Sequence, residues 1–283
     1  MDNNNLTNLK IHYHQELKEY DLHHSISNID EDADVVGFDF DHTFFSYNIH
    51  NLLEHIYIAF TKVLVHHKGY PKVLIFEEDH DQINRENMHK FACTEIVIDL
   101  LRGNLLKLDE NRSPIIVYHG VDKLNYDEVK KIYGETVNVS FENSKTKEYY
   151  INFTNFENHY IPIFAFCVHL YDKNLLPQID SYHRILEHIL EATKFNYTLK
   201  DPLTNQYYKM EEVGYYFPEI CKNTEKYVTK NIQYLEVLER LKKKGKHIFI
   251  VTNSTFEYTH ALMKSIFGDV NLILIIERLQ RLF

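Results

Sequence analysis

Two aspartates and a threonine, at positions 39, 41 and 43, are the residues of this chain whose types and spacing best suit chemistry. They follow an apolar run, residues 35–38, whose β-branched and aromatic side chains are typical of a short buried strand. Gly37 within the run indicates a close approach of another part of the chain. Acidic groups at the carboxyl end of such a strand lie where open α/β sheets bind ligands. The pattern therefore predicts a functional site directly after this strand.

Asp39 and Asp41 would repel each other if both were ionised at close range. A divalent cation relieves that repulsion, and oxygen ligands favour Mg²⁺, so both residues are predicted metal ligands. The pair also suits hydrolysis of a phosphate ester, with Asp39 as the nucleophile that forms an aspartyl phosphate and Asp41 as the general acid and base. The alternative is a solvated turn or an adventitious cation site. The strand and the trailing Thr43 together favour catalysis.

A second predicted strand, residues 247–251, ends at Thr252, Asn253 and Ser254. A hydroxyl and an amide at the end of a neighbouring parallel strand can donate hydrogen bonds to phosphoryl oxygens. The same turn could instead cap a helix over residues 256–267. With Asp39 placed on the adjacent strand, phosphate binding by Thr252 and Asn253 is the favoured interpretation.

The chain resembles the haloacid dehalogenase superfamily. Asp39, Asp41 and Thr43 match the D-x-D-x-T motif of that superfamily position for position. The stretch DLLRGNLLKLD at residues 99–109, followed by His119-Gly120 and Tyr133-Gly134, is similar to the cytosolic purine 5'-nucleotidase family. The segment YFPEI at residues 216–220 resembles one branch of that family. The resemblance extends from about residue 34 to about residue 271.

The resemblance implies an α/β fold: a Rossmann-like core with a parallel sheet, and a large mixed α+β cap inserted between the first and second motifs. It implies a Mg²⁺-dependent phosphatase acting on a nucleoside monophosphate or a related small phosphate ester. Thr252 would be the catalytic residue of the second motif, and Thr43, Thr252 and Asn253 would bind phosphate. Similar nucleotidases self-associate, so a homo-oligomer is a further expectation.

In the cap, similar proteins carry an Arg and, three residues later, an Asp that hold the nucleotide. The aligned substrate-binding positions here are His169 and Asp172. The Asp is retained and the Arg is replaced. We therefore expect a lower affinity for substrate, because histidine lacks the guanidinium fork and is neutral much of the time near pH 7. The alternative for His169 is a partly buried helix residue.

The chain departs from the family pattern at its carboxyl end. After Thr252 similar enzymes have a lysine, and Gln280 occupies that position here, with Arg281 as its cationic neighbour. The acidic motif that completes the magnesium site is missing, and Glu277 is a poor substitute. We therefore expect a core that is incomplete at the C-terminus, as in a truncated or mispredicted gene product or a degenerate paralogue. The alternative function is a catalytically impaired relative that binds a nucleotide or a protein.

The motifs also organise the chain. Residues 1–33 are expected to be a polar leader, residues 34–60 and 224–283 the core, and residues 61–223 the cap. Helices are predicted over residues 51–67, 160–171, 179–195 and 224–244, where apolar residues recur at helical spacing. Residues 94–118 predict extended segments of a β-hairpin-like element.

Composition fits a globular enzyme, because 283 residues with 44% hydrophobic content can build a large core. A formal net charge of -10 argues against nucleic acid as a partner. The three cysteines are far apart in sequence and predict neither a disulfide framework nor a zinc site. The N-terminal residues lack the pattern of a signal peptide and no apolar stretch is long enough for a membrane span, so a cytoplasmic protein without a membrane partner is expected.

Overall fold

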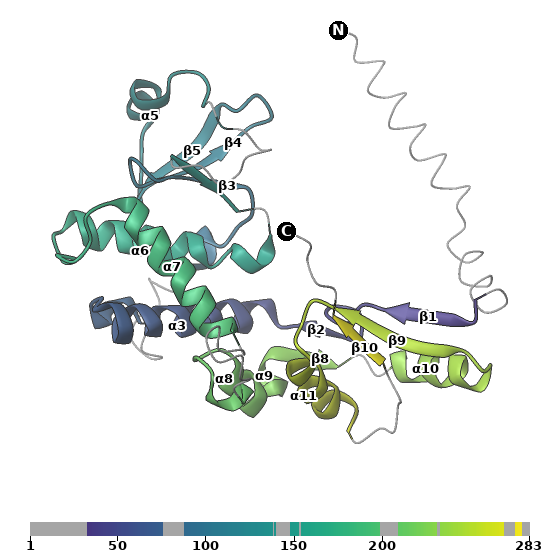
Figure 1. Cartoon of the computed structure of the whole chain (residues 1–283). Helices are drawn as coiled ribbons and strands as arrows, with labels where there is room; N and C mark the ends of the chain where they lie inside the picture. Colours follow the sequence, from purple (N-terminus) through teal and green to yellow (C-terminus); the bar gives the residue numbers. More distant parts are fainter. Residues whose placement is uncertain are drawn as a thin grey trace, which may run out of the picture. The chain divides into compact units, whose positions relative to one another are not determined.

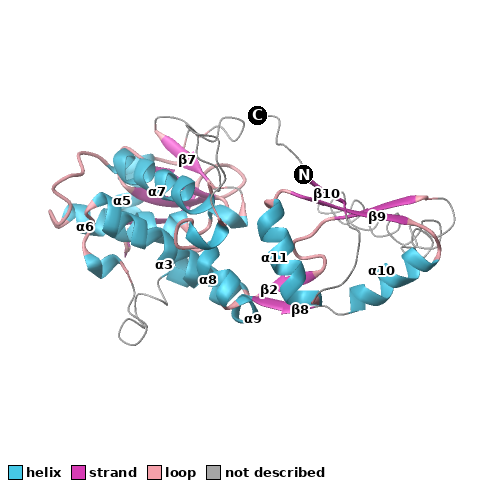
Figure 2. Cartoon of the chain, turned by 60° about the horizontal axis from the view of Figure 1, so that its bottom comes forward, coloured by secondary structure: helices cyan, strands magenta, loops and turns pink. Residues whose placement is uncertain are grey.

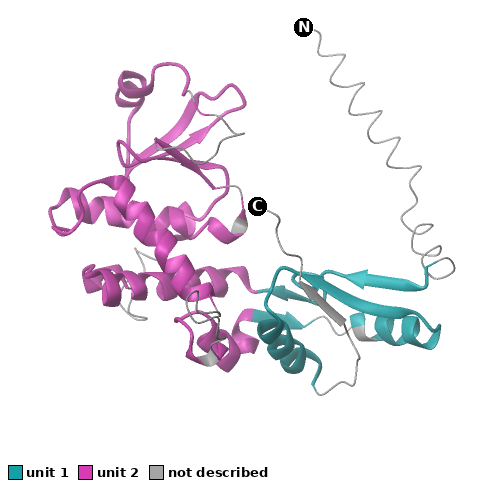
Figure 3. Ribbon diagram, in the orientation of Figure 1, with its two compact units in different colours: residues 1–47, 228–283 teal, residues 48–227 magenta. Residues whose placement is uncertain are grey.

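The computed structural model describes residues 33–75, 88–137, 139, 148–152, 154–198, 209–230, 233–268 and 275–278. The chain divides into two compact units, which Figure 3 colours separately. The first unit comprises residues 1–47 and 228–283, and the second unit comprises residues 48–227. The second unit thus interrupts the first in sequence. The predicted leader, apart from residue 33, lies outside the described residues.

The borders between the units differ from those expected for core and cap. Helix α3 runs without a break over Ile49–Lys68, so residues 48–60 belong to the second unit. Residues 224–227 belong to it as well. A border at residue 60 would cut one continuous helix, whereas the observed border falls just before the helix begins. That the second unit acts as a cap stays a prediction.

The first unit is built on a parallel sheet of three described strands, in the order β1 (Val35–Phe38), β9 (His247–Thr252) and β10 (Ile275–Arg278). Helix α10 (Gln233–Lys243) precedes β9 and helix α11 (Phe256–Phe267) follows it. Both helices lie over the same face of the sheet (Figure 2), as expected when successive right-handed crossovers advance in one direction. This parallel α/β arrangement confirms the fold class at the level of a Rossmann-like core.

Strand β1 is less buried than expected. Val35 is 55% exposed, and β1 has a single neighbour, β9, among the described strands. The expected close approach at Gly37 is confirmed, because a Cβ atom there would lie 2.6 Å from the ring of Phe249 on β9. Glycine therefore lets the Phe249 ring pack against the backbone of β1.

The single helix predicted over residues 224–244 is wrong. The segment forms a short helix, α9 (Thr224–Tyr227), then strand β8 (Val228–Lys230), and then α10. Strand β8 pairs antiparallel with β2 (Phe45–Tyr47), with Tyr47 opposite Val228. The β-branched residues Val228 and Thr229 favour an extended backbone, and a partner strand distant in sequence satisfies it.

The second unit combines an antiparallel sheet with helices (Figure 1). The sheet has the order β6-β5-β4-β3-β7, so the predicted hairpin-like element is confirmed as part of a larger sheet. Its strands are β3 (Ile96–Asp99), β4 (Asn104–Leu108), β5 (Pro114–His119), β6 (Asp122–Lys123) and β7 (Tyr149–Ile151). Its other α-helices are α5 (Tyr126–Tyr133), α6 (Tyr160–Asp172), α7 (Tyr182–Tyr197) and α8 (Phe217–Lys222). Three short 3₁₀ helices are Lys72–Leu74, Asn155–Glu157 and Met210–Glu212.

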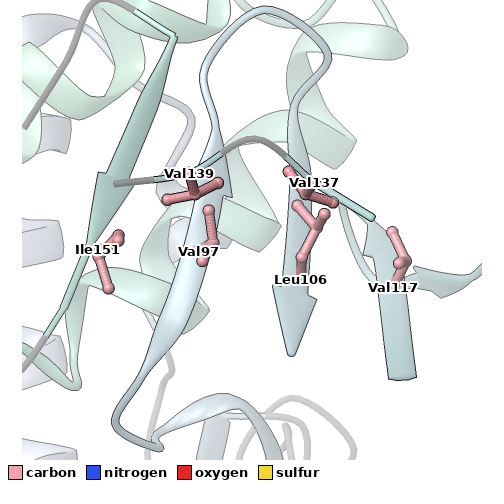
Figure 4. Close-up of a cluster of buried hydrophobic side chains, with 6 residues drawn as sticks. All are labelled: Val97, Leu106, Val117, Val137, Val139 and Ile151. Atoms are coloured by element: carbon pink, nitrogen blue, oxygen red, sulfur yellow. The ribbon is translucent and has the colours of Figure 1, made fainter. Parts of the chain in front are cut away.

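One face of this sheet carries a cluster of buried aliphatic side chains. Figure 4 shows it: β3, β4, β5 and β7 each contribute one residue, and Val137 and Val139 pack across them. The strand residues are Val97, Leu106, Val117 and Ile151. Contacts from α6 reach β4 and β5. The sheet is thereby a rigid support for residues at its strand ends.

Three of the four predicted helices are confirmed with small shifts in their ends. Helix α3 is capped by the side chain of Asn48 and ends at Gly69, whose φ of 73° suits glycine. Helix α7 begins after Ser181, whose hydroxyl accepts a hydrogen bond from the backbone of Arg184. Among the described helices, none combines the length and apolar character needed to cross a bilayer.

Candidate active site

The sequence-predicted catalytic residues lie at the carboxyl ends of two paired strands of the first unit. Asp39 follows directly after β1, and Thr252 is the last residue of β9. The strands are parallel and Phe38 is level with Ile250, so both ends lie at one edge of the sheet. This is the edge at which open α/β sheets bind ligands.

Asp39 is exposed to solvent. Its Oδ1 atom accepts a hydrogen bond of 2.7 Å from the backbone N–H of Phe40. This bond orients the carboxylate against its own backbone. The exposed carboxylate is accessible to a ligand that approaches the sheet edge.

Asp41 is half-buried and held on both oxygens by hydroxyl groups. The Tyr47 hydroxyl donates to Oδ1 at 2.6 Å, and the Ser254 hydroxyl donates to Oδ2 at 3.1 Å. The hydroxyl groups of Tyr47 and Tyr258 are 3.1 Å apart. Since Tyr47 uses its only proton toward Asp41, Tyr258 donates to Tyr47. Residues from β2, from α11 and from the turn between β9 and α11 thus orient Asp41.

A tight turn and an aromatic cluster position Asp41. The carbonyl of Phe40 accepts hydrogen bonds from the backbone N–H groups of Thr43 and Phe44, at 3.3 and 3.2 Å. Phe40 and Phe44 are fully buried. His42 has a φ of 59°, in the left-handed region that tight turns require. Burial of the two rings fixes the turn, while Asp41 and Thr43 remain half-buried at the sheet edge.

Thr252 and Asn253 are not used to cap the following helix. The N-cap of α11 is Thr255, whose hydroxyl accepts a hydrogen bond from the backbone of Tyr258. Thr252 is 1% exposed, and its hydroxyl accepts a bond of 3.1 Å from the backbone N–H of Ser254. Because that hydroxyl acts as an acceptor, its own proton can serve another acceptor. The capping alternative therefore does not account for Thr252 or Asn253.

The carboxylates of Asp39 and Asp41 are the predicted ligands of a cation at this edge. Among the described residues, no group of three or more His, Cys, Asp and Glu side chains is arranged to hold a metal ion. Mg²⁺, however, is commonly bound through one or two carboxylates together with water and phosphate oxygens. One accessible carboxylate next to an oriented one is compatible with that mode of binding.

The two predicted nucleotide-binding residues lie in the second unit, on α6. Asp172 is already engaged within this unit: Oδ2 lies 2.8 Å from Nε2 of His119, and Oδ1 accepts a bond of 2.8 Å from the Tyr182 hydroxyl. His169 is half-buried. Burial and the bond to Asp172 raise the pKa of Tyr182, so this phenol stays protonated and remains a donor.

The C-terminal departures are described only in part. Gln280 and Arg281 lie outside the described residues, and the backbone of Arg278 on β10 is level with Thr252. Glu277 is level with Val251 on β9, and β10 has no pairing with β1.

Sequence reasoning missed three residues around Asp41. Ser254 was visible in the Thr-Asn-Ser turn but received no role, and Tyr47 and Tyr258 have no local signal that separates them from the other tyrosines. Their hydroxyl groups reach Asp41 or one another only through tertiary pairing.

Comparisons with known proteins place the chain in a family. A model of the 5' nucleotidase family matches residues 27–277. The human and bovine proteins called 5'-nucleotidase domain-containing protein 1 are 28% and 29% identical to this chain, over 84% of it and 50% of their own length. A rat 5'-nucleotidase domain-containing protein 2 is 26% identical over 84% of this chain and 40% of its own. The chain thus spans about half the length of these relatives. The family match covers the sheet, both candidate strand ends and the second unit, and we conclude that this chain belongs to the 5' nucleotidase family.

Proposed function

We propose that this chain is a phosphatase of the 5'-nucleotidase type, which hydrolyses a nucleoside monophosphate or a related small phosphate ester through an aspartyl phosphate on Asp39. The observation that carries the proposal is the pairing of an exposed Asp39 with a hydroxyl-held Asp41 at one edge of a parallel sheet, in a chain of this family.

Asp39 supplies the nucleophile. One of its carboxylate oxygens attacks phosphorus, a P–O bond to Asp39 forms, and the ester P–O bond breaks. The leaving alkoxide takes a proton from Asp41 and departs as the alcohol, a nucleoside in the case of a nucleotide. Water then attacks phosphorus, Asp41 removes a proton from it, and phosphate leaves as Asp39 is regenerated.

The surroundings of Asp41 suit both of its protonation states. When Asp41 is ionised, Tyr47 and Ser254 donate to it. When Asp41 carries a proton, the Tyr47 hydroxyl can accept that proton's hydrogen bond and donate to Tyr258 instead, because a hydroxyl is both donor and acceptor. Asp41 can therefore keep its hydrogen bond to Tyr47 in either protonation state.

Thr43, Thr252 and Asn253 are the proposed phosphate ligands. The Thr252 proton and the exposed Asn253 amide are donors at the edge that carries Asp39. Asp39 and Asp41 would hold Mg²⁺. When bound there, the ion would supply positive charge that offsets the phosphoryl oxygens and the two carboxylates.

The remaining parts of the proposal concern substrate and setting. We assign contacts with the nucleotide to His169 and Asp172. The second unit, which contains both residues, would act as the cap of a haloacid dehalogenase-like core. The setting is cytoplasmic, and self-association is part of the proposal. The family match and the position of both residues on α6 support the assignment of the nucleotide contacts.

The test is phosphate release from a panel of nucleoside monophosphates and p-nitrophenyl phosphate, with and without Mg²⁺. We expect Asp39→Asn to lower turnover on the order of 10⁴-fold or more, because the nucleophile is removed. Asp34→Asn is the matched control, since it removes the same charge from an exposed residue at the opposite end of β1. Turnover that survives Asp39→Asn, or a folded wild-type chain without turnover, would contradict the proposal.

A further inference from the structure

A continuous set of hydrogen bonds connects the interior of the second unit with Asp172. It runs from Asp99 at the end of β3 through Tyr133 and Asn104 to His119 and then to Asp172. We call these five residues the polar network. Its members come from β3, α5, β4, β5 and α6, so it joins the sheet to the helices around it.

The inner end of the network, Asp99, accepts hydrogen bonds from all of its partners in this set. Asp99 is fully buried, and its Oδ1 accepts hydrogen bonds of 3.0 Å from the backbone N–H groups of Leu101 and Arg102. Its Oδ2 accepts from the Arg102 guanidinium at 3.0 Å and from the Tyr133 hydroxyl at 2.8 Å. Every neighbour of Asp99 in this set is a donor, so Asp99 acts only as an acceptor.

This inner end sets the direction of each following bond. Burial raises the pKa of Tyr133, so its hydroxyl keeps its single proton and donates it to Asp99. The same hydroxyl must then accept from Asn104, whose Nδ2 lies 2.8 Å away. The orientation of the Asn104 amide follows from this requirement. Its oxygen therefore faces His119.

Both ring nitrogens of His119 face acceptors. Nδ1 lies 2.8 Å from the amide oxygen of Asn104, and Nε2 lies 2.8 Å from Oδ2 of Asp172. The other oxygen of Asp172 accepts from Tyr182. A neutral imidazole has one N–H donor and would meet one of these oxygens with a lone pair. The complete set of bonds needs a proton on each nitrogen, and imidazole is more basic than a carboxylate.

We propose that His119 is a positioning residue, which as an imidazolium holds the Asp172 carboxylate in one orientation at the end of the polar network. The proposal rests on the proposed function where it takes Asp172 to be a contact of the nucleotide. The proposed reaction does not use the His-Gly pair at residues 119–120, and this proposal assigns it a role.

Two glycines allow the close packing around this pair. A Cβ atom at Gly120, φ 55°, would lie 3.2 Å from the backbone nitrogen of His169, so glycine lets the end of β5 approach α6. A Cβ atom at Gly103, φ 71°, would lie 2.8 Å from the ring of Tyr182. Gly103 thereby leaves room for the ring whose hydroxyl holds the second oxygen of Asp172.

The titratable groups that face His119 are Asp172 on α6 and Tyr182 on α7, whose ring lies 6.0 Å from the imidazole. On the sheet side the amide of Asn104 separates His119 from Tyr133 and Asp99.

The first experiment is ¹⁵N NMR of the histidine side chains at slightly acidic pH, with His119→Gln used to assign the His119 signals. We expect both ring nitrogens to have the shifts of protonated nitrogen. In Asp172→Asn the amide can donate to Nε2, so we expect Nε2 to move to the range of a bare nitrogen while Nδ1 stays protonated. A wild-type His119 with one bare nitrogen, or no change in Asp172→Asn, would overturn the proposal.

The second experiment compares KM and kcat for nucleoside monophosphates in His119→Gln. We expect KM to rise about 10-fold with kcat nearly unchanged, because a charge-assisted bond to a binding residue is lost. His183→Gln is the matched control: His183 pairs with Glu187 on the exposed side of α7, outside the network. An equal KM in the two variants would refute the positioning role. If no nucleotide is hydrolysed at all, the proposed function fails, while NMR still decides the state of His119.

Discussion

Asp41 in the first unit and Asp99 in the second are both carboxylates near the end of a strand, but their surroundings differ. Asp99 is fully buried and accepts four hydrogen bonds, one from a guanidinium and two from backbone N–H groups. Asp41 is half-buried and accepts two hydrogen bonds, both from hydroxyl groups that can reverse their roles. A carboxylate whose two oxygens both accept bonds from fixed donors stabilises a fold. A carboxylate whose partners can either donate or accept can exchange a proton.

Asp41→Asn provides the largest expected effect and tests the chemical half of the comparison. An amide cannot transfer a proton to the leaving group, so we expect turnover to fall about 10²- to 10⁴-fold. Stability should change little, because Tyr47 and Ser254 can each donate to or accept from an amide. Phosphate release and urea unfolding measure the two quantities. A large loss of stability with turnover intact would reverse the roles assigned to Asp41 and Asp99.

Asp99→Asn tests the structural half. An amide supplies one acceptor oxygen in place of two, so Tyr133 or the backbone donors lose a partner, and we expect the free energy of unfolding to fall by about 3 kcal/mol. Urea unfolding followed by circular dichroism is the measurement. Asp109→Asn is the control, since Asp109 accepts backbone N–H bonds from Asn111 and Ser113 in an exposed turn. Equal losses in the two variants would show that burial of Asp99 is not the cause.

His159 sharpens the comparison as a buried polar group without partners. It is 2% exposed beside Phe60, and neither ring nitrogen reaches a hydrogen-bond partner among the described residues. Burial lowers its pKa from 6.5 to about 3. Below pH 6.5 the unfolded chain gains a proton that the folded chain does not bind. Stability contributed by neutral His159 is therefore present above that pH and is lost as the pH falls.

We expect the free energy of unfolding to fall by about 1.4 kcal/mol for each pH unit between 6.5 and the lowered pKa of about 3. His159→Leu should remove this part of the slope when the free energy of unfolding is measured against pH. Burial also lowers the pKa of His55, so a slope of the same sign should persist in the variant. Identical slopes in wild type and variant would show that His159 gains its proton in the folded state as well.

Tyr47→Phe gives the smallest expected effect and separates orientation from proton transfer. Loss of one hydroxyl donor to Asp41 should lower turnover about 5-fold and stability by about 1 kcal/mol. Tyr258→Phe is the matched control, because it removes only the bond one step farther from the carboxylate. The comparison predicts a larger loss of turnover for Tyr47→Phe. An equal or larger loss of turnover for Tyr258→Phe would contradict the orienting role of Tyr47.

Much of the first unit follows from local sequence patterns. The apolar runs before Asp39 and before Thr252 predict two strands, and both form, in parallel and side by side. Gly37 predicts a close approach, and the Phe249 ring provides it. These features depend on neighbours in sequence, or on the rule that strands joined by a helical crossover pair in parallel, and so they can be read without coordinates.

Other features depend on partners that are far apart in the chain. Residues 224–244 have helical spacing throughout, yet Val228–Lys230 becomes a strand because Phe45–Tyr47 supplies its hydrogen bonds. The hydroxyl of Ser254 reaches Asp41 across 213 positions of sequence, and His119 reaches Asp172 across 53. No periodicity or local propensity contains such a pairing, because a side chain's partner is set by how strands and helices pack.

The residue types that could carry the chemistry, and the strand ends at which they lie, can be read from the sequence, because D-x-D-x-T and Thr-Asn-Ser each follow an apolar run typical of a strand. How each carboxylate is held depends on the folded chain. Tyr47 and Ser254 were brought to Asp41 by strand pairing and by the turn before α11, and His119 and Tyr182 to Asp172 by packing of the sheet against its helices. Hydrogen bonds need contact within about 3 Å, and the fold provides that contact between residues distant in sequence.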